Sequence, residues 1–222
     1  MSILVSPQVP SNEYVILLHG LARSDRSFRK LASVLNKKGY HTINCGYPSR
    51  KYPIDTLAQH AISDALSHCP KGSKVNFVTH SMGGILVRQY LSTNLIENLG
   101  RVVMLGPPNK GSEVVDSLRS IPGFKLFNGP AGMQLGTEVD SVPNKLGAAD
   151  FDLGIIAGTR SINIILSTML PNQNDGKVSV ENTKLAGMKD HICLPVTHPF
   201  MMKNNTAINQ VLHYLDHGQF SR

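Results

Sequence analysis

Short apolar runs alternate with helical hydrophobic patterns along most of the 222-residue chain. The run at 14–18 is continuously apolar and ends at a His-Gly pair, which is typical of a strand buried on both faces. Phe28, Leu31 and Leu35 then recur at helical spacing, and Gly39 marks the end of that helix. Further β-like runs lie at 41–45, 74–79, 101–105, 153–159 and 191–196. One helical pattern follows a capping box formed by Thr56 and Gln59, and two more cover 82–94 and 204–216. This order predicts an α/β fold with a mostly parallel sheet of about six strands flanked by helices.

Residues 107–150 break the alternation, because glycines and prolines recur there without a regular hydrophobic period. A short amphipathic helix is expected inside the segment, with Ser112 as its cap and one apolar side made of Val114, Val115, Leu118 and Ile121. The apolar content argues against disorder, and an insertion this long in a compact domain is usually functional. We therefore expect a single domain over residues 1–222, with a cap or lid at about 107–150 over a pocket.

The sequence FVTHSMGGIL at 77–86 places Ser81 between a predicted strand and a predicted helix. A serine at a sharp strand-to-helix turn can serve as a nucleophile whose oxyanion is stabilised by backbone amides. An ordinary helix-capping serine is the alternative. The pair Gly83-Gly84 favours the nucleophile, since Gly83 lets the helix pack tightly against the strand. Thr79 departs from the pattern Gly-x-Ser-x-Gly, which has glycine at that position.

VTHSMGG, together with His19-Gly20 after an earlier strand, resembles the α/β-hydrolase superfamily, and most of all its small serine lipases and esterases. The resemblance spans nearly the whole chain in strand–helix order, although only 17–21, 79–84, 175–178 and 198 carry specific motifs. In that family the catalytic triad follows the chain order serine, acid, histidine. The resemblance therefore implies that the acid and the base lie after Ser81.

Asp175 in NDGKV is the expected acid, since the resemblance places the triad acid in an Asp-Gly-x-Val segment of this kind. A turn-forming aspartate is the alternative for Asn-Asp-Gly. Three other aspartates precede strands, at the wrong end for the site: Asp150, Asp152 and Asp190.

His198 is the expected base, because it follows the last strand, where the resemblance places that residue. His191, at the start of the same strand, is the alternative. His213 and His217 have a spacing that could bind a metal, but they lack a third ligand, so a solvated helix face is expected.

The oxyanion hole is expected from the backbone amides of Met82 and, by resemblance, Leu21. His19, Gly20 and His80 are expected at the substrate pocket or its turns. The predicted activity is hydrolysis of a carboxylic ester, with an acyl chain or other lipid-like group as the expected substrate, and with no metal or organic cofactor. Two alternatives remain open: an acyltransferase or thioesterase that uses the same triad, and a non-catalytic ligand-binding relative.

The net charge of +7 resides in the segment 21–52, which has eight basic residues and one acid. Such a segment could contact an anionic membrane surface, although a solvated helix face is the more ordinary interpretation. No nucleic-acid-binding module is recognisable, so nucleic acid is not expected as a partner. Neither a secretory leader nor a membrane-spanning run is evident, which favours a cytoplasmic protein. The sequence leaves the oligomeric state undetermined.

Overall fold

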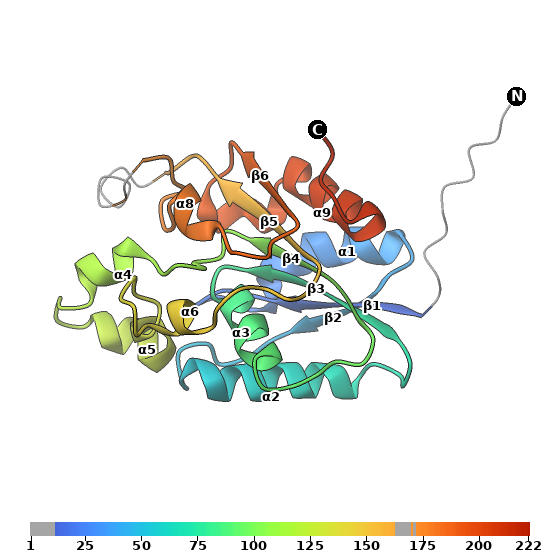
Figure 1. Ribbon diagram of the computed structural model, residues 1–222, viewed down its shortest axis with the longest axis horizontal. Helices are drawn as coiled ribbons and strands as arrows, with labels where there is room; N and C mark the ends of the chain where they lie inside the picture. Colours follow the sequence, from blue (N-terminus) through green and yellow to red (C-terminus); the bar gives the residue numbers. More distant parts are fainter. Residues whose placement is uncertain (1–11, 163–169, 171) are drawn as a thin grey trace, which may run out of the picture.

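A computed structural model describes residues 12–162, 170 and 172–222, and in it six strands form one parallel sheet in the order β2-β1-β3-β4-β5-β6 (Figure 1). The sequence interpretation of residues 1–11 lies outside the described residues. Every strand pair is parallel. The predicted α/β architecture, a mostly parallel sheet of about six strands flanked by helices, is therefore confirmed.

The strands fall close to the apolar runs of the sequence, and the helices fall between them. The strands are β1 (Glu13–Leu18), β2 (His41–Cys45), β3 (Lys74–His80), β4 (Leu99–Leu105), β5 (Leu153–Gly158) and β6 (Asp190–Leu194). The longer helices are α1 (Arg29–Lys37), α2 (Ile54–Ser67), α3 (Met82–Leu91), α5 (Phe124–Met133) and α9 (Asn205–His217). The shorter ones are η1 (Asp25–Phe28), α4 (Glu113–Leu118), α6 (Val142–Lys145), α8 (Val180–Thr183) and η2 (His198–Lys203).

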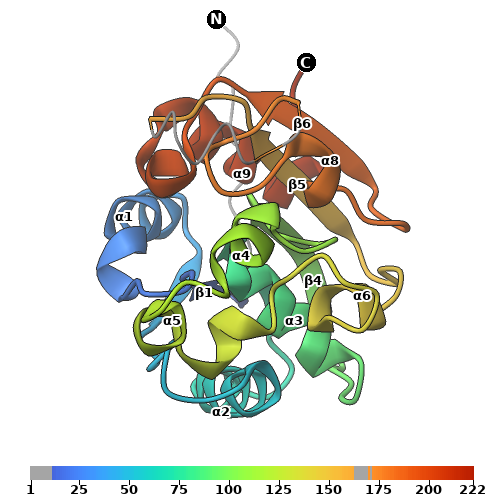
Figure 2. The same ribbon diagram turned by 90° about the vertical axis from the view of Figure 1, so that its left-hand side faces the viewer.

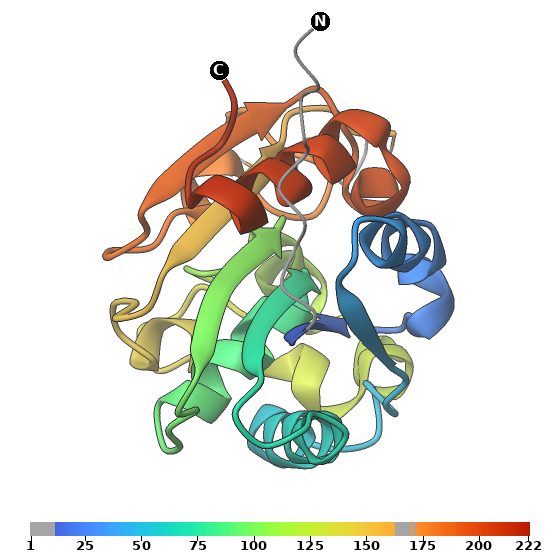
Figure 3. The same cartoon turned by 90° about the vertical axis from the view of Figure 1, so that its right-hand side faces the viewer.

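Both faces of the sheet are covered, so its central strands are apolar on both sides. In β1, Val15 and Leu17 pack into the core under α1 and α9, whereas Ile16 and Leu18 pack into the core under α2 and α3. Figures 1 and 3 show these two helical layers on opposite faces. This arrangement brings the carboxyl ends of β1, β3, β4 and β5 to one edge, where ligands bind in open α/β sheets.

The segment 107–150 lies beyond that edge and contains α4, α5 and α6 (Figure 2). Buried Arg88 of α3 holds both ends of the segment, since its guanidinium donates to the carbonyl oxygens of Asn109, Pro143 and Gly147 at 2.8–3.0 Å. Burial lowers the pKa of Arg88 to about 10, which still leaves the side chain charged at neutral pH. The segment is therefore attached to the sheet domain at its beginning and at its end.

One helix start and one capping hydrogen bond differ from the sequence interpretation. Helix α2 begins at Ile54 after Pro53, so the predicted capping box of Thr56 and Gln59 is wrong. Proline has no amide to cap and a fixed φ that suits a helix start, which explains the earlier beginning. Ser112 does stand at the N-cap of α4, but its hydroxyl donates to the Lys177 carbonyl instead of capping the helix.

No helix among the described residues is long and apolar enough to cross a membrane.

Candidate functional site

Ser81 occupies a strained turn between β3 and α3. Its backbone has φ of 54° and ψ of −124°, a left-handed conformation that residues other than glycine rarely adopt. The Ser81 amide donates to the Leu105 carbonyl at 2.9 Å, and its own carbonyl accepts from Gly84 at 3.0 Å. The surrounding hydrogen bonds thus hold the serine in a conformation that projects it from the sheet edge.

Glycines permit the close approach of chain segments around this turn. A Cβ on Gly83 would lie 2.3 Å from the Leu18 carbonyl oxygen, so only glycine lets α3 begin so near β1. A Cβ on Gly20 would lie 2.9 Å from His80 Nδ1 and 3.0 Å from Ser81 Cβ. Thr79 remains a regular strand residue, paired with Leu18 and Met104, so the tight turn starts only after it.

Asp175 and His198 form a buried pair. His198 Nδ1 lies 2.7 Å from Asp175 Oδ2, and the two residues are 7% and 1% exposed. The other carboxylate oxygen, Oδ1, accepts the amides of Lys177 and Val178 at 2.9 Å each. The His198 amide also donates to the Asp175 carbonyl at 3.1 Å. The carboxylate is therefore fixed from three sides and aligned on the ring nitrogen, the arrangement that orients a general base.

Gly106, directly after β4, makes room for this pair and was not identified from the sequence. Its φ is +55°, and a Cβ there would lie 2.9 Å from Asp175 Oδ2 and 3.2 Å from His198 Nδ1. The available signal was the strand-ending Leu-Gly-Pro at 105–107, which marks a turn but does not reveal its distant neighbours.

Ser81 and His198 both line one cavity of about 320 Å³ at the carboxyl edge of the sheet. Residues of the 107–150 segment cover it and supply an apolar wall made of Pro108, Val114, Val115, Phe124 and Leu135. Polar and charged groups line the remainder, from Arg23, Ser112, Asn128 and Lys177. The cavity can thus hold an amphiphilic molecule against the serine.

His19 and His80 lie at the two turns but differ in their relation to the cavity. His80 lines it, with its Nε2 at 2.9 Å from the His198 carbonyl and its ring centroid 4.6 Å from that of His198. Burial, followed by the nearby His198 charge, holds the pKa of His80 well below its usual range, so His80 is neutral. His19 is fully buried, stacks on Tyr47 at 4.0 Å and is not among the cavity-lining residues. Its Nε2 accepts the Tyr47 amide, and burial lowers its pKa, so it supports the turn as a neutral ring.

The two residues expected to supply the oxyanion hole follow β1 and β3, and of the two only Leu21 is among the cavity-lining residues. Leu21 lines the cavity next to Gly20. Its neighbours are engaged within the turn, since Ala22 donates to Ser49 Oγ at 3.0 Å and Arg23 donates to the Gly20 carbonyl at 3.2 Å. Met82 is the first residue of α3, where an amide has no partner within the helix.

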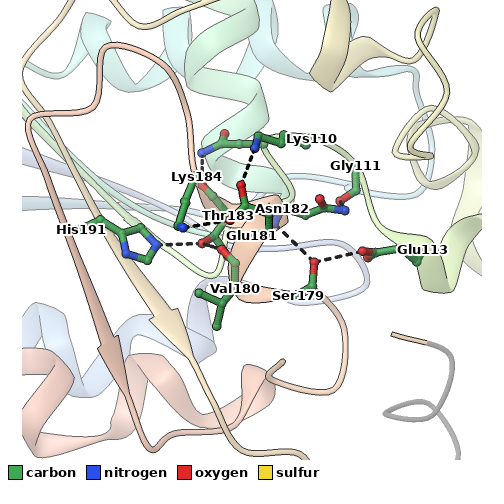
Figure 4. A network of polar contacts seen from close by, with 11 residues as sticks. Lys110, Gly111, Glu113, Ser179, Val180, Glu181, Asn182, Thr183, Lys184 and His191 are labelled. Atoms are coloured by element: carbon green, nitrogen blue, oxygen red, sulfur yellow. Dashed lines mark hydrogen bonds and ion pairs between the residues drawn. The ribbon is translucent and has the colours of Figure 1, made fainter. Parts of the chain in front are cut away.

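His191, the alternative base, lies in a different network (Figure 4). Its Nε2 is 3.0 Å from Thr183 Oγ1 of α8, and burial lowers its pKa. The same network joins α8 to the start of the 107–150 segment through Lys110–Glu181 and Ser179–Glu113 contacts, both at 2.9 Å. These contacts anchor the chain that follows Asp175, and they keep His191 out of the Ser81 cavity.

The other acidic and histidine candidates also have separate roles. Asp152 accepts the Tyr214 hydroxyl, and Asp190 accepts the Phe220 amide. The His213 and His217 rings lie 4.4 Å apart on α9. Among the described residues, no group of three or more metal-ligating side chains is assembled there or elsewhere.

Solved structures with this fold include several hydrolases. The chain is similar to the Bacillus licheniformis lipase BlEst2 in its mature form, with 20% identity and a TM-score of 0.72 over 93% of each chain. It is similar to the Legionella pneumophila phospholipase PlaB at 18% identity and a TM-score of 0.71, over 90% of this chain and 57% of that one. The chain is also similar to the Rhodococcus sp. esterase RhEst1, with 15% identity and a TM-score of 0.62 over 93% of this chain and 91% of that one.

These identities establish a shared fold only. No curated protein sequence matches the chain. Residues 15–161, about two thirds of the sequence, match the family model described as alpha/beta hydrolase family. With the parallel sheet and the serine turn between β3 and α3, this match shows that the chain belongs to the alpha/beta hydrolase family.

Proposed function

We propose that the protein is a serine hydrolase that cleaves carboxylic esters through an acyl-enzyme on Ser81. The observation that carries the proposal is the buried Asp175–His198 pair, which opens on the same cavity as the strained serine. A serine hydroxyl is a weak nucleophile at neutral pH and needs both a base and a group that orients the base. The lipase and esterase neighbours in the structure comparison are consistent with this chemistry.

In the proposed reaction, Ser81 Oγ attacks the carbonyl carbon of the ester while His198 Nε2 takes the serine proton. Asp175 stabilises the resulting imidazolium through the 2.7 Å contact with Nδ1. The amides of Leu21 and Met82 donate to the oxyanion. His198 then gives its proton to the departing alcohol oxygen as the tetrahedral intermediate collapses. Water attacks the acyl-enzyme with His198 as base, and release of the acid restores Ser81.

The acyl group is proposed to lie along the apolar wall that the 107–150 segment provides. The exposed side chains Leu126 and Phe127, which are 84% and 69% exposed, lie on the same segment. Leu126 borders a second hollow with Arg23, Arg50 and Lys51. Apolar side chains beside basic ones favour binding to an anionic membrane surface, so we propose this contact as part of substrate access.

The test combines labelling with turnover. A fluorophosphonate probe should label Ser81, located by peptide mass spectrometry, and p-nitrophenyl butyrate hydrolysis should disappear in Ser81→Ala. Ser112→Ala is the matched control, because Ser112 lines the same cavity but lies outside the proposed triad. Unchanged hydrolysis in Ser81→Ala, or labelling of Ser112 instead, would refute the proposal. Product analysis with glycerol added shows whether an alcohol competes with water for the acyl-enzyme.

A further inference from the structure

Two cationic side chains line the cavity beside the proposed nucleophile. Arg23 belongs to the turn after β1, which is fixed by the Arg23 amide on the Gly20 carbonyl and by the Ala22 amide on Ser49 Oγ. Ala22 has φ of 55°, an uncommon value for a residue with a side chain. The turn that carries Arg23 is therefore held in one conformation next to the Leu21 amide.

Lys177 belongs to the turn that carries Asp175. Its amide donates to Asp175 Oδ1 at 2.9 Å, and its carbonyl accepts the Ser112 hydroxyl at 2.8 Å. The pKa of Lys177 lies below its ordinary value, first because neighbouring atoms partly desolvate the ammonium and second because Arg23 repels it, while Asp175 acts in the opposite direction. Lys177 and Arg23 line the same cavity, so both charges add to the positive potential there.

Within the described part of the chain, neither cation forms an ion pair with a carboxylate. Asp175, the acid in the same turn as Lys177, is engaged by His198 and by two backbone amides. Two cations without a carboxylate partner on the lining of one cavity create a positive potential that favours a bound anion.

The same cavity is also lined by apolar side chains of the 107–150 segment, namely Val114, Val115, Phe124 and Leu135. The cavity therefore offers one surface for a hydrocarbon chain and another for a negative charge, with Ser81 lining it as well. Resting on the proposed ester hydrolysis, we infer that the natural substrate is an acyl ester whose alcohol part carries a phosphate or carboxylate, bound by Arg23 and Lys177. The acyl chain contacts the apolar wall while the anion contacts the two cations.

A matched substrate pair measures this selectivity. Monohexanoylglycerol and monohexanoylglycerol 3-phosphate present the same acyl ester and differ in the anionic group. A second pair, 3-hexanoyloxypropanoate and its methyl ester, separates carboxylate from phosphate recognition. Release of hexanoate is followed for each, and inorganic phosphate is added to the neutral substrate as a free anion. We expect a kcat/KM for the anionic ester at least tenfold above that of its neutral partner.

Arg23→Gln and Lys177→Gln should each lower the anionic-to-neutral ratio of kcat/KM about tenfold, mainly through KM. Lys37→Gln is the control, since it removes the same charge from an exposed residue of α1 that does not line the cavity. Both target side chains are exposed, so these substitutions leave the fold intact.

Three outcomes would overturn the inference. The wild-type protein could prefer the neutral esters. A variant that combines Arg23→Gln with Lys177→Gln could keep the wild-type ratio. The variants could also lower kcat equally on neutral and anionic esters, which would mean that the cations act on the oxyanion. None of these outcomes changes the separate prediction that Ser81→Ala no longer hydrolyses the neutral ester. Failure of the inference is therefore distinguishable from failure of the proposed function.

Discussion

Gly83→Ala tests the packing that fixes the nucleophile turn. The added Cβ would lie 2.3 Å from the Leu18 carbonyl oxygen and 3.0 Å from that of His19, whereas ordinary contacts begin at 3.4 Å. Both obstacles are backbone atoms of the β1 end, so no side chain can rotate away. The start of α3 must withdraw by about 1 Å, a kind of overpacking that typically costs about 1–3 kcal/mol.

The same withdrawal moves the Met82 amide, which we propose as an oxyanion donor. A displacement of about 1 Å at a catalytic group can lower the rate about 100-fold, and loss of one oxyanion donor costs about 100- to 1,000-fold. We therefore expect kcat for p-nitrophenyl butyrate to fall about 100-fold. For a chain of this length, a loss of about 2 kcal/mol lowers the Tm by roughly 4–8 °C.

Gly84→Ala is the matched control on the next residue. Its Cβ would meet Met104 Sδ at 2.9 Å, an atom of a flexible side chain that can move. Thermal unfolding and steady-state kinetics on both variants should give a clear ranking, with Gly83→Ala much the worse in Tm and in kcat. Wild-type values in Gly83→Ala, or equal losses in the two variants, would refute the argument that backbone contact at Gly83 sets the turn.

Three further changes test other parts of the structure. Asp175→Asn should lower kcat about 1,000- to 10,000-fold, because an amide can donate to His198 Nδ1 and favour the wrong tautomer. Steady-state kinetics measure this loss, and a loss below tenfold would contradict the proposed role of Asp175. Thr79→Val should raise the unfolding free energy by about 1 kcal/mol, because Thr79 Oγ1 is buried without a hydrogen-bond partner in the described structure. Urea unfolding measures this free energy, and a lower value in the variant would contradict the absence of a partner for the hydroxyl. The double variant Leu126→Glu, Phe127→Glu should reduce co-sedimentation with phosphatidylglycerol vesicles several-fold while soluble-ester turnover persists; unchanged sedimentation would remove this surface from the proposed membrane contact.

The order of strands and helices was predictable because each central strand is buried on both faces and is therefore continuously apolar in sequence. The serine turn was predictable for a related reason. The turn needs a strand before it, small residues after it and a helix beyond, and all of these are local in the sequence at 77–86. A feature that depends only on neighbouring residues can therefore be predicted from a short stretch of sequence.

The parts that could not be predicted depend on distant contacts. Gly106 resembles any glycine at the end of a strand, and only the fold shows that Asp175 and His198 occupy the space beside it. His19 was expected at the pocket or its turns, but Tyr47 stacks on it and keeps it beneath the turn. Ser112 resembles a helix cap in sequence, yet its hydroxyl bonds to a carbonyl 65 residues away.

Arg88 has a consequence for how substrate can enter. Its guanidinium donates to carbonyl oxygens at both ends of the 107–150 segment, and charged hydrogen bonds of this kind contribute about 1.5–3 kcal/mol each. A rigid swing of the whole segment would break several of these bonds and leave a buried cation unsolvated. We therefore expect the proposed substrate to enter by rearrangement between the two anchored ends, where α5 bends at Gly129. We therefore expect any opening of this segment to be a local bend between its two anchored ends, and not a rigid rotation of the whole segment.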